Sequence, residues 1–121
     1  MYRNKTIATI ALLGSAAAAS MGVLFAAGKT VTVKGEVVDL SCYMSHGAHG
    51  EKHKDCAVTC IKGGAPMGLL ASGGRVYLLM SAMGHKSPQD LLLDKVADTV
   101  EVTGTENVQG GIRSLTIETV K

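Results

Sequence analysis

Residues 30–40 read TVTVKGEVVDL and carry the pattern from which the fold is predicted. Odd-numbered positions are mostly valine and even-numbered positions are mostly polar, and this period of two is typical of a β-strand. A glycine in the middle of the run, Gly35, indicates a bulge or a sharp bend. We expect this strand to deliver Asp39 and Cys42 to the segment that follows.

All three cysteines and three of the four histidines lie in the next segment, residues 42–60, CYMSHGAHGEKHKDCAVTC. Its candidate metal ligands are Cys42, His46, His49, His53, Cys56 and Cys60. Successive candidates are three or four residues apart, which is the spacing of neighbours on one face of a helix. Thiolate and imidazole are ligands that zinc and copper prefer. The pattern therefore predicts a metal or redox site.

Two glycines, Gly47 and Gly50, limit the helix in this segment, because each disfavours helix by about 1 kcal/mol relative to alanine. We expect a loop over residues 43–50 and a helix over residues 51–62, which ends at glycines 63–64. The last three candidate ligands would share a face of that helix. The loop would have to bring in the other three.

The remainder of the chain predicts more strands than helices. Further strands are expected at residues 67–71, 75–80, 98–106 and 112–120, and a short helix is expected at residues 88–96. Five strands with a helix between the third and the fourth is the connectivity of an OB-fold, a Greek-key barrel. We therefore predict a mainly β fold, a small five-stranded OB-like barrel with one or two short helices. An open five-stranded sheet is the alternative.

The N-terminal segment predicts export. Basic residues at positions 3 and 5 precede residues 6–27, which carry no charge and are mostly apolar. This pattern is typical of a signal peptide over residues 1–27. An uncleaved leader would instead anchor the protein in a membrane through residues 6–27. In both cases we expect a periplasmic or extracellular location.

Beyond the leader, the chain has the size of one small domain, residues 28–121, with a Cys/His insert at residues 42–62. Two of the 12 basic residues belong to the leader, so the domain has 10 basic and 10 acidic residues. A domain without net charge offers no electrostatic basis for binding nucleic acid. Because its core is small, a metal ion or a disulfide would add useful stability.

The arrangement GEVVDLSCYM…HKDCAVTCIKGGAPMGLL…GRVYLL…VEVTGT…GGIRSLTIE resembles a group of small exported bacterial proteins. Those proteins have an OB-like barrel and cysteines after the first strand. The resemblance covers most of residues 28–121. It implies the barrel fold and the exported location, and it implies no activity.

The odd number of cysteines leaves several functions open. We predict an exported metal-binding protein that holds one zinc or copper ion, either for structure or for metal buffering and delivery. The alternative is a disulfide-stapled module whose barrel binds a protein or a small ligand. A thiol-redox accessory protein is a third hypothesis. A thiol count separates the first two, because a metal site leaves three titratable thiols and a disulfide leaves one.

The sequence offers little support for catalysis. A hydrolytic zinc site needs an open coordination position and a general base. Glu51 and Asp55 flank the cluster, but charged residues beside a ligand face of a helix are usually its solvated side. The sequence contains neither the CxxCH motif of haem attachment nor the CxxC redox motif. It therefore favours a binding protein over an enzyme.

Overall fold

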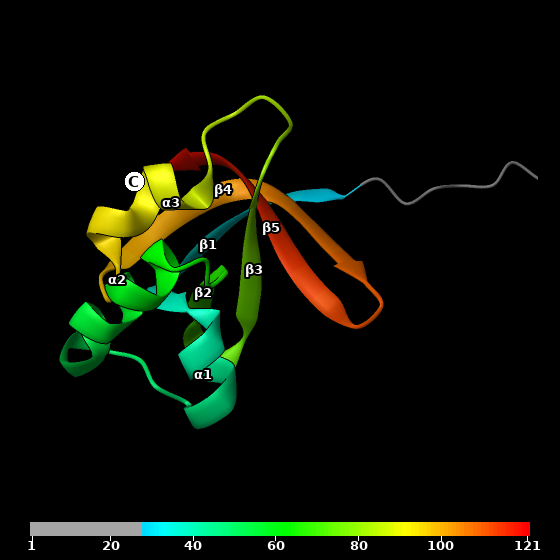
Figure 1. The fold of residues 1–121 in the computed structure, drawn as a ribbon. Helices are drawn as coiled ribbons and strands as arrows, with labels where there is room; N and C mark the ends of the chain where they lie inside the picture. The colour runs from blue at the N-terminus through cyan, green and yellow to red at the C-terminus, as the bar shows by residue number, and fades with distance from the viewer. Residues whose placement is uncertain (1–27) are drawn as a thin grey trace, which may run out of the picture.

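The computed structural model describes residues 28–121, which form a closed barrel of five strands (Figure 1). The strands are β1 (Lys29–Asp39), β2 (Met67–Ala71), β3 (Val76–Ser81), β4 (Thr99–Gln109) and β5 (Ile112–Val120). Their order is β1-β2-β3-β5-β4, and β4 pairs with β1 to close the barrel. The pair of β3 and β5 is parallel, and the other four pairs are antiparallel. The predicted mainly β class is confirmed. The predicted signal or anchor, residues 1–27, lies outside the described residues.

Strand β1 connects the two sides of the barrel. Its first part pairs with β4 and its last part pairs with β2, while Gly35 and Glu36 pair with both neighbours. Gly35 is buried, and a Cβ atom there would lie 2.6 Å from the carbonyl oxygen of Leu70. The glycine therefore permits a close approach of two backbones.

The core fills the barrel and extends under the helices. Fully buried side chains come from β1, β2, β4 and β5, with Val37, Leu69, Val102 and Leu115 as examples. Ile61 joins the same core from a helix. The helical segment that carries the cysteines is thus attached to the barrel by apolar packing.

Three short α-helices lie between the strands, α1 (Leu40–His46), α2 (Lys54–Lys62) and α3 (Pro88–Leu92). Single turns of 3-10 helix occur at Glu51–His53, Ser72–Gly74 and Leu93–Lys95. The predicted helix over residues 51–62 is confirmed, as a 3-10 turn followed by α2. Residues 28–121 contain three α-helices, so the prediction of one or two was too low for this part of the chain.

The prediction of a loop over residues 43–50 was wrong for its first half, where α1 lies. The carboxylate of Asp39 caps the start of α1 by accepting a hydrogen bond from the Cys42 backbone N–H. Gly47 ends α1 with a left-handed φ of 68°. Gly47 therefore marks the end of α1 and does not prevent the helix before it.

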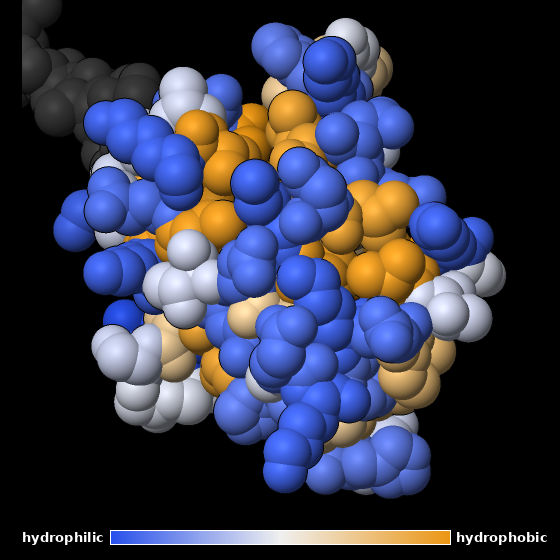
Figure 2. Space-filling model, turned by 90° about the vertical axis from the view of Figure 1, so that its left-hand side faces the viewer, coloured by the Kyte–Doolittle hydropathy of each residue, from blue (hydrophilic) through white to orange (hydrophobic). Residues whose placement is uncertain are grey.

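The face of the molecule that carries α2 and α3 is mainly hydrophilic, with apolar residues in separate patches (Figure 2). Among residues 28–121 no helix has the length and apolar character needed to cross a bilayer.

Candidate metal centre

Four neighbouring elements bring the candidate site together. Asp39 is the last residue of β1, and Cys42 lies in the first turn of α1. His53 ends the 3-10 turn, and Cys56 and Cys60 lie on α2. The elements meet at one end of the barrel, where α1 and α2 follow the end of β1 (Figure 1).

Cys42 is the centre of the cluster. The ligand atoms of Cys42, His53 and Cys56 all lie within 4.8 Å of one another. The ligand atoms of Asp39, Cys42 and Cys60 also lie within 4.8 Å of one another. Four of the six predicted ligands therefore fall into two groups that share Cys42, and the second group includes a carboxylate that the sequence analysis had not counted among the ligands.

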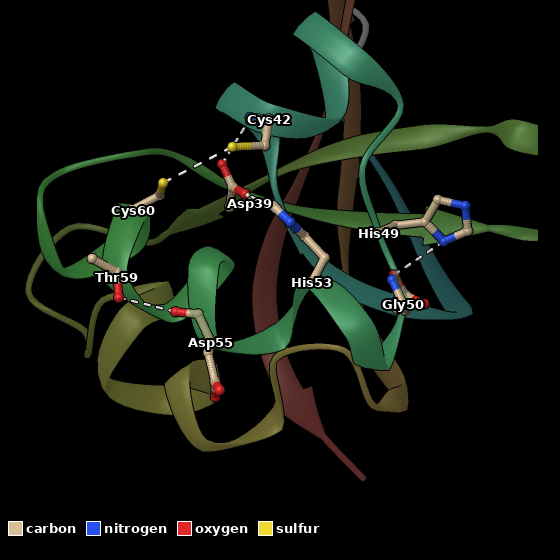
Figure 3. A network of polar contacts seen from close by, with 9 residues as sticks. Asp39, Cys42, His49, Gly50, His53, Asp55, Thr59 and Cys60 are labelled. Carbon is tan, nitrogen blue, oxygen red and sulfur yellow. Dashed lines mark hydrogen bonds and ion pairs between the residues drawn. The ribbon is translucent and has the colours of Figure 1, made fainter.

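The Sγ atoms of Cys42 and Cys60 are 3.9 Å apart (Figure 3). Two sulfurs on one tetrahedral zinc, each at 2.3 Å from the ion, would be about 3.8 Å apart. A disulfide would bring the same atoms to about 2.05 Å. All three cysteines are free thiols in this structure. The separation fits two ligands of one ion, and it also fits a hydrogen bond between two free thiols.

Asp39 lies between Cys42 and His53 (Figure 3). It is 1% exposed and is the one buried charged side chain within residues 28–121. Its Oδ1 accepts a hydrogen bond of 2.9 Å from the Cys42 backbone N–H. Its Oδ2 lies 3.1 Å from Nε2 of His53. One carboxylate therefore holds the backbone of one candidate ligand and the side chain of another.

The pKa of Asp39 lies below its ordinary value. Burial alone would raise it, but the hydrogen bonds from the Cys42 N–H and from His53 outweigh burial. The group is therefore an anion at neutral pH. This charge favours a proton on Nε2 of His53, which leaves Nδ1 as the nitrogen with a free lone pair. A carboxylate that holds a histidine in this way is a common second partner of metal-binding histidines.

Burial, the neighbouring Cys60 thiol and the Asp39 charge together raise the pKa of the Cys42 thiol to about 12, and burial is the largest of these causes. Without an ion, Cys42 is therefore a neutral thiol. An ion that binds there must displace its proton, so binding releases protons to solvent.

His46 and His49 lie outside both groups of ligand atoms. His46 is exposed in the last turn of α1. His49 contacts Glu36 instead, with 3.5 Å between Nδ1 and Oε2, and packs edge-on against Tyr43 with 6.1 Å between ring centroids. Figure 3 shows His49 apart from the cysteines. Their role as metal ligands stays a prediction.

The sequence analysis did not predict the role of Asp39, because it did not predict the helix α1 that begins at the next residue. An aspartate followed by a helical turn is a typical N-cap. Recognising residues 40–46 as a helix would have placed this carboxylate at its first turn, beside the Cys42 N–H.

Comparisons with protein-family models, with curated protein sequences and with solved structures found no match. The functional argument therefore rests on the geometry of the site.

Proposed function

We propose that this protein binds one zinc or copper ion through Cys42, His53, Cys56 and Cys60. The observation that carries the proposal is the 3.9 Å separation of the Cys42 and Cys60 sulfurs, with the ligand atoms of His53 and Cys56 within 4.8 Å of Cys42 Sγ. Three thiolates and one imidazole form a closed tetrahedral set that is typical of zinc. The same thiolates suit copper(I).

Binding would cross-link two helices that follow one another along the chain. An ion would link α1, which carries Cys42, to α2, which carries Cys56 and Cys60. Because the ligands come together only in the folded chain, the free energy of metal binding would add to the free energy of folding. Such a link adds most to the stability of a small barrel, because its hydrophobic core is small.

The second candidate function is a disulfide-stapled module that binds a protein or a small ligand. The same short separation of Cys42 and Cys60 favours these two as the bonded pair. Cys56 is exposed and would remain a free thiol. Oxidation would give a bond between α1 and α2 in place of the ion.

We also propose that the barrel is of OB type and that the protein is exported. The strand order β1-β2-β3-β5-β4, with its parallel pair of β3 and β5, supports the first proposal. The basic and apolar leader, residues 1–27, supports the second.

The test is elemental analysis of the protein, purified from the export compartment of its native host without added metal, together with a thiol count after chelation and denaturation. About one zinc or copper ion per chain and three thiols would support the metal site. No metal and one thiol would select the disulfide-stapled module. No metal and three thiols, with no ion bound when zinc or copper(I) is added, would overturn both.

A further inference from the structure

We propose that Cys56 is the ligand through which the bound ion leaves, and that the acceptor is a partner that presents two thiolates. The inference rests on the proposed metal-binding function and deepens it. It is carried by the unequal exposure of the ligands, which makes one side of the centre closed and the other open.

The closed side is the side of Asp39. The Asp39 carboxylate has no exposed surface, and the side chain of His53 is 18% exposed. Cys42 and Cys60 are each partly buried. The hydrogen bonds of Asp39 to the Cys42 N–H and to His53 hold two of these ligands in place. An incoming ligand cannot reach the ion from this side without breaking a buried contact.

The open side is the side of Cys56, which is the exposed cysteine of the three. It lies one turn before Cys60 on α2, while Ala57 and Ile61 of the same helix are buried at 3% and 1% exposure. The packing of these two residues fixes the helix, so the Cys56 side chain can move away from the ion while α2 stays in place. Solvent or a second thiolate can then take its coordination position.

The acceptor needs two thiolates. One thiolate would replace Cys56 and leave the ion held by Cys42, Cys60 and His53. A second thiolate on the same molecule acts at high effective concentration, so it can displace a further ligand. The exchange involves no electron transfer. Two acceptor thiols give up protons as they bind the ion, and the cysteines that release the ion take up protons in their place.

The experiment compares Cys56→Ser with Cys60→Ser, which change the same chemical group one helical turn apart. Both variants and the wild-type chain are titrated with zinc alone. The loaded proteins are then mixed with a synthetic peptide that contains a CxxC pair. In parallel, the zinc-loaded wild-type chain is treated with iodoacetamide, and the order of cysteine modification is read by peptide mass spectrometry.

The proposal predicts that iodoacetamide modifies Cys56 first and that the ion stays bound at that stage. Cys56→Ser should still bind one ion, with a Kd higher than that of the wild-type chain, because water can fill the open position. It should also pass its zinc to the peptide faster than the wild-type chain does. Cys60→Ser should lose stoichiometric binding. In the wild-type chain the transfer rate should rise with peptide concentration.

First modification at Cys42 or Cys60, or a transfer rate that does not depend on peptide concentration, would overturn the inference and leave the metal site standing. Equal effects of Cys56→Ser and Cys60→Ser on zinc binding and on zinc transfer would likewise overturn the inference and leave the metal site standing. Circular dichroism of both variants without zinc checks that each is folded. A wild-type chain that binds no zinc in the titration would instead overturn zinc binding, and the exchange proposal with it.

Discussion

The carboxylate of Asp39 and the imidazole of His53 are joined by a hydrogen bond of 3.1 Å between Oδ2 and Nε2. The two residues are 14 positions apart, and one ends β1 while the other ends the 3-10 turn before α2. The bond therefore ties the helical segment to the barrel. It also determines which histidine nitrogen is free to bind an ion.

Replacing Asp39 with asparagine tests this relationship. The amide oxygen of Asp39→Asn can still accept from the Cys42 N–H, but its NH2 group would face Nε2 and move the histidine proton to Nδ1. We expect zinc affinity to fall about ten- to a hundredfold, measured by competition with a chelator. The matched control is Asp94→Asn, because that side chain is 75% exposed. Equal affinities of the two variants would contradict the role of Asp39.

The lowered pKa of Asp39 predicts a pH dependence of stability. Its hydrogen bonds outweigh the opposing effect of burial, so its folded pKa is below its unfolded pKa. Such a group stabilises the fold above its unfolded pKa and loses this contribution as pH falls through the folded pKa. Metal-free wild type should therefore lose stability relative to Asp39→Asn below about pH 4. Urea denaturation across this range gives the difference, and a constant difference would argue against the hydrogen-bonded anion.

The raised pKa of Cys42 predicts that metal affinity increases with pH. At a pKa of about 12 the thiol is protonated in the metal-free protein throughout the neutral range. Displacement of the Cys42 proton should lower the apparent Kd about tenfold per pH unit between about pH 7 and pH 9. Proton release in weakly buffered solution provides a second measurement. An affinity without pH dependence would mean that Cys42 is not a ligand.

The histidines provide a further test of the ligand set. His53→Ala removes the imidazole that lies beside Cys42 and Cys56, and it should abolish stoichiometric zinc binding. His46→Ala changes an exposed residue at the end of α1 and should leave binding unchanged. Metal content per chain after dialysis measures both. A loss of zinc in His46→Ala would add that histidine to the ligand set.

Gly35 tests the barrel itself. An alanine Cβ there would lie 2.6 Å from the Leu70 carbonyl oxygen, so β1 and β2 would have to separate. We expect Gly35→Ala to lower the free energy of unfolding by about 1–3 kcal/mol, measured by urea denaturation. Gly63→Ala is the control, because the nearest atom to a Cβ there is 3.3 Å away and its φ is −81°. Equal stability of Gly35→Ala and wild type would contradict the close approach.

The regular elements could largely be predicted because their signals are local. The valine alternation of β1, the glycine turn between β2 and β3 and the N-cap serine Ser87 each lie within the element they define. The largest error was at α1. The prediction treated Gly47 as a residue that prevents a helix, whereas in the structure it is the residue at which α1 ends. The end of β4 was also placed too early, since the strand runs to Gln109.

The positions of the strands along the chain and the chemical types of the ligands could therefore be predicted from the sequence, because periodicity and residue type are local properties of the chain. Which ligands meet depends on the packing of the folded protein. The tertiary structure brought Cys42 to Cys60 across 18 residues, left His46 and His49 outside both groups of ligand atoms and placed the Asp39 carboxylate beside His53. These contacts depend on how α1 and α2 pack at the end of β1. That packing is set by the buried core, and no local spacing encodes it.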